Sequence, residues 1–323
     1  MGDVTMIDKF GSLFAGHIDL DNIGFAGTAA NDRFYSNDEL ITVFDKTEAI
    51  CTLMDDLGYD VFWMAEHHFQ PEGYECIPNI LQLSVHLAHL TKNIKMGCGF
   101  NIAPEVPYRG YTLKEISLVP RPINMPVECW QPIVSAGDRG LNFMAKHGIK
   151  GIIGGGAAPG GASENVVRKW QEVQAAHGND TELGGDLILG ISFFIANSPE
   201  EAIEQARPFY EENMKMFAPL GFVRGLSDDQ LAALADPARA PHADLPTLES
   251  AVESGSWLVG TPEQIIEQME DIEKRWPGLD HVNMGLPVGT PQSVILEQTE
   301  AFGKEVMPHF KNRMATAAAA GDN

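Results

Sequence analysis

An apolar run over residues 59–69, YDVFWMAEHHF, ends in a carboxylate and two adjacent imidazoles. An apolar run without polar alternation is typical of a strand buried on both faces, as in a parallel sheet. The sequence therefore predicts that Glu66, His67 and His68 lie at the carboxyl end of a strand, the edge where α/β enzymes place their chemistry. Histidine changes protonation near neutral pH and can transfer a proton to a reacting atom. We predict that these three residues form the catalytic group.

Strand-like runs alternate with segments that begin like helices along most of the chain. Hydroxyl side chains at Ser36, Ser198 and Thr261 precede an acid or amide three residues later, and prolines follow two of them directly. Such a pattern is typical of a helix start, and Pro78 predicts another. Besides the first run, strands are expected at 10–14, 94–100, 129–136, 152–153, 187–196 and 282–286. About seven strands alternating with helices predict a TIM-type (β/α)₈ barrel that is incomplete.

The expected gap in the barrel lies between residues 100 and 130. This stretch has prolines at 104, 107, 120, 122 and 126, and only residues 112–118 could be helical. A parallel crossover normally needs a helix of about ten residues or more to pack back on the sheet. Either the barrel lacks a strand here, or neighbouring strands connect unusually. We expect one domain over residues 1–312, a last helix from 290 to about 306, and a disordered tail at 313–323.

The charge of the chain excludes several classes of partner. Lys and Arg number 22 against 45 Asp and Glu, which gives a net charge of −23 that would repel nucleic acid and anionic lipid. The N-terminus lacks a signal-peptide pattern, and no apolar run approaches the ~20 residues needed to span a bilayer. We therefore expect a cytoplasmic protein that binds neither membranes nor nucleic acid. The four cysteines show no CxxC spacing, so no zinc or haem pattern is present.

Three segments resemble the bacterial luciferase-like flavin-dependent monooxygenases, the alkanal monooxygenase-like group. They are AEHHF at 65–69, GCGFNIAP at 97–104, and VGTPEQIIEQME with the later FGKEVMPHF. The resemblance implies a TIM barrel, reduced FMN or a deazaflavin as cofactor, and a homodimer. Relatives usually continue from such an NIAP segment into another helix and strand that contact the flavin. Here Pro104 runs directly into Glu105, so a central βα segment is missing.

The resemblance also implies roles for particular residues. It makes His67 the acid/base residue and the turn at 135–140 the flavin-phosphate site, where a helix N-terminus offers N–H groups. Ser135, Ala136, Gly137, Arg139 and Gly140 are the predicted cofactor contacts in that turn. Cys98 and Asn101 are expected to border the isoalloxazine ring. Gly154 and Gly155 begin a glycine-rich loop that would let the backbone approach the flavin or form a mobile lid, and an ordinary flexible loop stays an alternative.

We therefore predict a monooxygenase that uses O₂ on a small apolar organic substrate resembling an aldehyde or a terpene. A separate flavin reductase is expected to supply reduced FMN, because the chain lacks the GxGxxG fingerprint of NAD(P)-binding proteins. Aromatic and apolar residues predicted to line the substrate pocket are Phe62, Trp63, Phe69, Phe100, Phe193, Phe194 and Met284.

Three alternatives stay open at this point. The first is a flavin-binding protein of the same fold without turnover, and the second is a deazaflavin-dependent oxidoreductase. The third is a metal-dependent barrel hydrolase that uses Glu66, His67 and His68 together with His86 and His89. Adjacent strand residues point to opposite faces, so His67 and His68 would not easily bind one metal ion.

Overall fold

The computed structural model describes residues 6–68, 70–98, 106–108, 111–113, 128–134, 136–223 and 225–313. Its main feature is a parallel sheet of seven strands in one continuous path, in the order β3-β2-β1-β10-β8-β7-β6, with β9 paired to the far half of β8. The strands are β1 (Lys9–Phe14), β2 (Val61–Met64), β3 (Lys95–Cys98), β6 (Trp130–Pro132), β7 (Lys150–Ile153), β8 (Leu187–Ile195), β9 (Trp257–Gly260) and β10 (His281–Gly285). The sheet forms an incomplete TIM-type barrel, as predicted.

The opening of the barrel lies where the sequence predicted it. β3 and β6 are the two ends of the strand path, and they flank the proline-rich stretch in the sequence. In that stretch the structure describes an antiparallel hairpin of β4 (Val106–Tyr108) and β5 (Tyr111–Leu113), which belongs to a separate two-stranded sheet. The one segment of this stretch with helical potential, 112–118, begins as a strand instead, because Thr112 and Leu113 pair within this hairpin.

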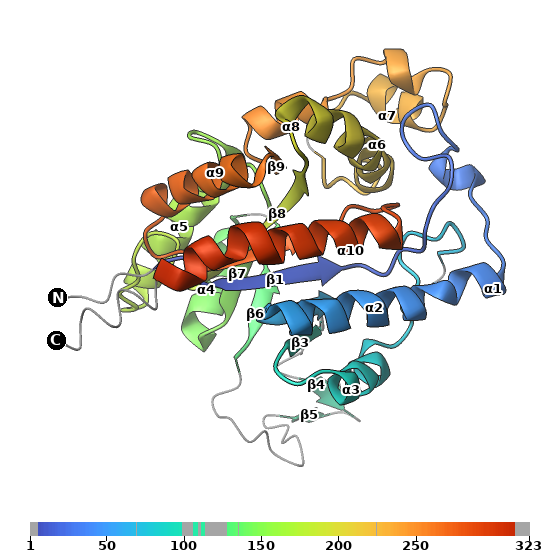
Figure 1. The fold of residues 1–323 in the computed structure, drawn as a ribbon. Helices are drawn as coiled ribbons and strands as arrows, with labels where there is room; N and C mark the ends of the chain where they lie inside the picture. Colours follow the sequence, from blue (N-terminus) through green and yellow to red (C-terminus); the bar gives the residue numbers. More distant parts are fainter. Residues whose placement is uncertain are drawn as a thin grey trace.

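Helices cover the outer face of the sheet (Figure 1), and α2 and α10 lie side by side across β1. The helices are α1 (Asn37–Leu40), α2 (Thr42–Leu57), α3 (Ile80–Leu90), α4 (Asp138–His147), α5 (Ala162–Ala176), α6 (Pro199–Phe217), α7 (Asp228–Leu234), α8 (Leu248–Glu253), α9 (Pro262–Arg275) and α10 (Gln292–Ala301). Short turns are η1 (Ala30–Asp32), η2 (Ala240–His242) and the π-helical η3 (Phe302–Val306). None of the described helices is long and apolar enough to cross a bilayer.

The predicted helix starts are confirmed at Ser36, Ser198 and Thr261, whose side chains each accept a hydrogen bond from the backbone N–H three residues later. The start predicted at Pro78 lies two residues further on, at Ile80, because Asn79 is the N-cap of α3. The last helical segment is longer than expected. It continues through η3 to Arg313, whose guanidinium pairs with Glu273 of α9.

The hydrophobic core lies between the outer face of the sheet and the helices. Phe10, Phe14 and Phe62 point from the strands into this layer, where they meet Phe302 and Phe310. Intervening strand residues point to the opposite side, which we call the inner face: Gly11, Leu13, Val61, Trp63, Gly97 and Asn283. Leu13 is 47% exposed on this face, as expected for a barrel that lacks a wall.

Phe302 is expected to be a main stabilising residue, because its fully buried ring packs against those of Phe10 (5.7 Å between centroids), Tyr59 (6.3 Å) and Phe193 (5.2 Å). Replacing it with alanine leaves a cavity, and Phe302→Ala should lower the free energy of unfolding by about 3–5 kcal/mol in a urea titration. Phe34→Ala is the matched control, because that ring is 82% exposed. Equal effects of the two substitutions would contradict this description of the core.

Candidate functional site

Glu66, His67 and His68 lie in the loop that follows β2. The strand ends at Met64, so the trio is not part of the strand and the alternation argument does not fix its geometry. The loop nevertheless separates the two imidazoles. His68 Nε2 lies 3.3 Å from Glu66 Oε1, whereas His67 turns to another partner. Glu66 also accepts a hydrogen bond from the Ile80 N–H at the start of α3, 3.2 Å away.

His67 pairs with Glu75, a residue that the sequence did not single out. Its Nδ1 lies 2.9 Å from Glu75 Oε2, and the same oxygen accepts a hydrogen bond of 2.8 Å from the Gln70 side chain. The Glu75 side chain is only 9% exposed, while that of His67 is 37% exposed. Burial raises the pKa of Glu75, and the charge of His67 offsets part of this shift. An imidazole held beside a buried carboxylate, with part of its ring in solvent, can exchange a proton with a bound substrate.

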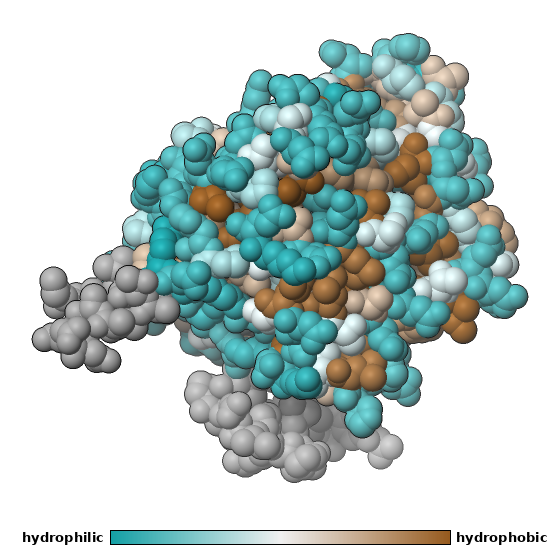
Figure 2. All heavy atoms as spheres, viewed as in Figure 1, coloured by the Kyte–Doolittle hydropathy of each residue, from teal (hydrophilic) through white to brown (hydrophobic). Residues whose placement is uncertain are grey.

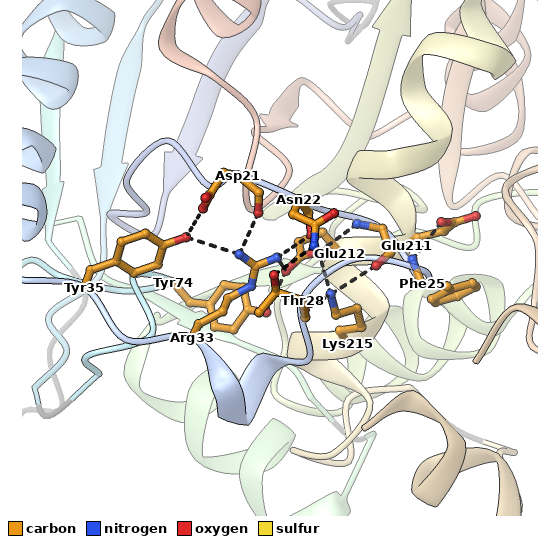
Figure 3. A network of polar contacts seen from close by, with 11 residues as sticks. Asp21, Asn22, Phe25, Thr28, Arg33, Tyr35, Tyr74, Glu211, Glu212 and Lys215 are labelled. Carbon is orange, nitrogen blue, oxygen red and sulfur yellow. Dashed lines mark hydrogen bonds and ion pairs between the residues drawn. The ribbon is translucent and has the colours of Figure 1, made fainter. Parts of the chain in front are cut away.

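A buried ion cluster lies next to this pair (Figure 3). Glu212 of α6 is at its centre, with Oε1 3.0 Å from the Arg33 guanidinium and Oε2 2.9 Å from Lys215 Nζ. The hydroxyl of Tyr74 donates to Oε1 at 2.7 Å, and the Gly24 N–H donates to Oε2 at 2.9 Å. The three charged side chains are at most 1% exposed. Burial lowers the pKa of Lys215, although the charge of Glu212 opposes this shift.

The cluster holds the loop after β1 against α6. Arg33 donates to the carbonyls of Asp21 (2.8 Å) and Asn22 (3.1 Å), and Lys215 donates to those of Gly24 (3.1 Å) and Thr28 (2.5 Å). Tyr74 brings in the loop after β2 as well, as Figure 3 shows. The two loops are therefore fixed to each other and to α6.

Backbone hydrogen bonds join the same two loops directly. Ile18 N–H donates to Gly73 O (3.0 Å), Tyr35 N–H to Pro71 O (3.0 Å) and Cys76 N–H to Gly16 O (2.8 Å). On the other side, buried Lys46 of α2 joins the loops after β1 and β10 through Asp19 Oδ1 (2.8 Å) and Thr290 O (2.7 Å). Burial lowers the pKa of Lys46 to about 8.

The predicted phosphate turn lies between β6 and α4. Ala136, Gly137, Arg139 and Gly140 are exposed, and Ser135 lies outside the described residues. Gly137 is the N-cap of α4, and no side chain in the described part of the chain caps this end. Asp138, which would oppose a phosphate, is paired with Lys169 of α5 at 3.0 Å. An uncapped, exposed helix N-terminus can hold an anion, so the turn fits a phosphate group.

Of the residues predicted to border the flavin ring, the structure describes only Cys98. Cys98 ends β3 with its sulfur 2.9 Å from Ser84 Oγ of α3, so its side chain points to the helix layer, and its contact with the flavin ring stays a prediction. Gly97 holds the inner position instead, where a Cβ would collide with the Trp63 ring. Asn101 lies outside the described residues, as do Phe69 and Phe100.

The glycine-rich loop after β7 is anchored by hydrogen bonds. Ser163 Oγ donates to the carbonyls of Gly154 and Gly155, and the N–H groups of 156–158 donate to the carbonyls of Ser254 and Gly255. A Cβ at Gly155 would lie 2.9 Å from the Ser256 backbone, so glycine there allows close packing of the two segments. These contacts argue against a mobile lid.

Most of the predicted pocket residues belong to the core. Phe62, Phe193, Phe194 and Met284 are at most 4% exposed. Phe62, Phe193 and Met284 pack in the main core, and Phe194 packs against Phe209 of α6 in a second cluster, whereas Trp63 is half-buried on the inner face. A cavity of about 430 Å³ lies elsewhere, between α6, η2, α8 and the loop at Phe25, and includes none of the trio. The prediction for these four residues is wrong, because aromatic strand residues here pack against the helices.

The residues of the metal alternative are spread over the surface. His86 of α3 pairs with Glu48 of α2 at 3.1 Å, with both side chains about half exposed. His67 and His68 have different carboxylate partners. Among the described residues, no three His, Cys, Asp or Glu side chains converge in a geometry that could hold a metal ion.

Comparison with known proteins defines the family. The sequence model of the family described as luciferase-like monooxygenase matches residues 23–107 and 103–277. The chain belongs to this family. Its enzymes depend on a flavin or on F420. The two matched stretches of this luciferase-like monooxygenase meet at 103–107, beside Pro104 and Glu105, where the missing βα segment was predicted and the sheet is open.

Solved structures of this fold include enzymes with different cofactors. The oxygenating component of 3,6-diketocamphane monooxygenase from Pseudomonas putida, in complex with FMN, has a TM-score of 0.63 and 14% identity, over 94% of this chain and 98% of its own. The F420-dependent tetrahydromethanopterin reductase of Methanopyrus kandleri has a TM-score of 0.60 and 13% identity, over 94% and 100%. At such identities the likeness shows the fold alone.

A curated relative matches over a shorter stretch. The uncharacterized protein YwcH of Bacillus subtilis (strain 168) is 35% identical over 74 residues, which cover 23% of this chain and 21% of YwcH. The match thus spans about a fifth of that relative, and it carries no activity over to this chain.

Glu212 should be essential for stability, because its removal leaves Arg33 and Lys215 buried without a counter-charge. Glu212→Gln is expected to lower the free energy of unfolding by about 3–5 kcal/mol in urea. The neighbouring Glu211→Gln is the control, since Glu211 is only half-buried and an amide oxygen can still accept the hydrogen bond from the Phe25 N–H. A loss below about 1 kcal/mol for Glu212→Gln would contradict the cluster's stabilising role.

Proposed function

We propose that this luciferase-like monooxygenase uses reduced FMN and O₂ to oxidise a small apolar organic molecule resembling an aldehyde or a terpene. The observation that carries the proposal is the His67–Glu75 pair in the loop after β2, on a chain of this family. When bound, the reduced flavin would supply the electrons for oxygen activation, and the protein's part is binding, orientation and proton transfer.

The described residues fit a flavin in two places. The exposed N-terminus of α4, from Gly137 to Gly140, would hold the phosphate through its N–H groups. The inner face offers the half-buried Trp63 ring and the exposed Leu13 side chain for a planar apolar ring system. Gly190 of β8 lies on the same face, and only Ile153 O would come within 4 Å of a Cβ there, at 3.4 Å.

The trio at the sheet's edge would provide the proton chemistry. His67 would act as acid/base, and Glu66 with His68 would bind and orient the substrate through the side chains that they expose. The exposed loop edge, rather than a closed cavity, would be the entry side for a small apolar substrate. A separate flavin reductase would supply FMNH₂, and the reaction would take place in the cytoplasm.

A deazaflavin cofactor is the second candidate. The Methanopyrus kandleri reductase, which is F420-dependent, has nearly the same TM-score to this chain as the FMN complex. A third candidate, flavin binding without turnover, is favoured by the open sheet between β3 and β6. Fluorescence titrations with FMN and with F420, followed by product analysis, separate these candidates.

His67→Ala should lower kcat for oxidation of an n-alkanal series, supplied with FMNH₂ and O₂, by about 10²- to 10⁴-fold, the usual contribution of an acid/base residue. FMN binding is expected to stay within about threefold, because His67 is not among the proposed cofactor contacts. His86→Ala, on the outer surface of α3, serves as the control. FMN binding with no product from any wild-type reaction would favour the non-catalytic candidate, and unchanged turnover in His67→Ala would remove that residue from its role.

We propose further that the protein is a homodimer that associates through α1–α3. Five large apolar side chains on and between these helices, namely Ile41, Phe44, Leu81, Val85 and Leu90, are 37–75% exposed. Figure 2 shows hydrophobic patches over α2 and α3. Desolvation of such side chains is a driving force for association.

Val85→Asp should shift the protein from dimer to monomer in sedimentation velocity, because it places a charge in the proposed interface. Phe222→Asp is the control, since Phe222 is similarly exposed (58%) but follows α6. A wild-type protein that sediments as a monomer at high micromolar concentration would refute the proposed dimer.

A further inference from the structure

We propose that Glu75 is the positioning residue of His67: it keeps the imidazole proton on Nδ1 and leaves Nε2 as the atom that exchanges protons with the substrate. The assignment rests on the proposed function in so far as His67 acts on a substrate. The state of the imidazole itself can be tested without turnover.

The contact between the two side chains constrains the tautomer. His67 Nδ1 and Glu75 Oε2 are 2.9 Å apart. A bare nitrogen lone pair facing a carboxylate oxygen at that distance would be repelled, so one proton must lie between the two atoms. With that proton on Nδ1, Nε2 carries the free lone pair of the neutral ring.

The orientation of the ring agrees with this assignment. The Glu75 carboxylate is 9% exposed, whereas 37% of the His67 side chain is exposed. The Nδ1 side of the ring therefore faces a shielded carboxylate, while part of the side chain stays open to solvent. Among the described residues Nε2 has no hydrogen-bond partner, so it is available to a substrate.

Glu75 is held from several directions and cannot easily follow a moving imidazole. Gln70 donates to Oε2 at 2.8 Å, and the next residue, Cys76, donates its N–H to Gly16 O after β1. The preceding residue, Tyr74, donates its hydroxyl to Glu212 in the ion cluster. The His67 backbone is fixed as well, because its N–H donates to Ile77 O at 3.0 Å. The pair thus lies on the loop after β2, which the loop after β1 and the ion cluster hold against α6.

The charges around the pair define its response to pH. Glu72 lies near enough to raise the pKa of Glu75, and Glu66 with His68 forms the other ionisable pair of the loop. Among these groups burial raises the pKa of Glu75, so the carboxylate that faces His67 Nδ1 is itself sensitive to its surroundings.

Two other histidine–carboxylate pairs of the protein lie on the surface and differ from the His67–Glu75 pair in the exposure of the carboxylate. His86 pairs with Glu48 at 3.1 Å and His309 with Glu270 at 2.8 Å, and in both pairs each partner is more than a quarter exposed. Water screens such pairs, so they impose little on the ring. Glu48→Gln is therefore a matched control for Glu75→Gln.

The test is ¹⁵N NMR of the histidine ring nitrogens in the whole protein, for wild type, Glu75→Ala, Glu75→Gln and Glu48→Gln. We expect wild-type His67 to carry its neutral-form proton on Nδ1. Glu75→Ala should move the proton mainly to Nε2, and Glu75→Gln, whose amide oxygen can still accept, should keep most of the Nδ1–H form. Glu48→Gln should leave His67 unchanged. Glu75→Gln also keeps the test valid if the alanine variant does not fold.

Kinetics with FMNH₂, O₂ and an n-alkanal give the second readout. Glu75→Ala should lower kcat by about 10- to 100-fold with KM within about threefold, and Glu75→Gln should recover part of the rate. A wild-type proton on Nε2, or a tautomer unchanged in both Glu75 variants, would overturn the proposal. The expected tautomers in a protein without turnover would support the Glu75 assignment and count against the proposed function instead.

Discussion

The ion cluster around Glu212 is the interaction on which the carboxyl edge of the sheet depends. Removing a charged group from water costs several kcal/mol per ion, and only close partners with good geometry offset that cost. Glu212 has two cationic partners, a tyrosine hydroxyl and a backbone N–H, all within 3.0 Å. The cluster therefore forms only when the loops after β1 and β2 are in place on α6, and once formed it holds them there.

This anchoring matters because the barrel is open. In a closed barrel, each strand end is supported by a strand on both sides, but β3 and β6 end the strand path here. The loop that carries His67 follows β2, directly next to the edge strand β3. This loop is held by hydrogen bonds to the loop after β1 and by the bond from Tyr74 to Glu212. Lys46 of α2 in turn holds the loop after β1 through Asp19. A luciferase-like chain can thus have a barrel that is open between β3 and β6 and still hold in place the loops that carry its ionisable residues.

The sequence predicted the architecture because the determinants of the fold are local. Apolar runs, hydroxyl caps and the proline-rich stretch each act within about ten residues, so they predict strands, the starts at Ser198 and Thr261, and the position of the gap. Helix faces were less predictable: Leu81 and Val85 have the spacing of a buried face, but Leu83 and Leu87 are the buried residues of α3. An apolar periodicity with two possible phases does not show which one faces the sheet.

The candidate site was predicted in its histidines but not in their partners. The sequence pattern indicates a strand end followed by two histidines. Glu75, by contrast, is one of several acidic residues in a loop, and only the fold shows that it is the one buried beside His67. Glu212 and Lys215 are spaced like a solvated helix pair, and burial by distant loops gives them their role. The position of Cys98 at a strand end does not show which way its side chain points, because pairing with β2 and packing on α3 set that orientation.

Native-state hydrogen exchange is the most direct measurement of whether the ion cluster holds the two loops in place. The relevant amides are Gly24, which donates to Glu212, and Ile18 and Cys76, which join the loops after β1 and β2. If the cluster holds the edge of the open barrel, these loop amides should exchange only through large-scale opening, with protection approaching that of β1 and β10. Exchange of all three at the rate of an unstructured loop, while β1 and β10 stay protected, would contradict the account.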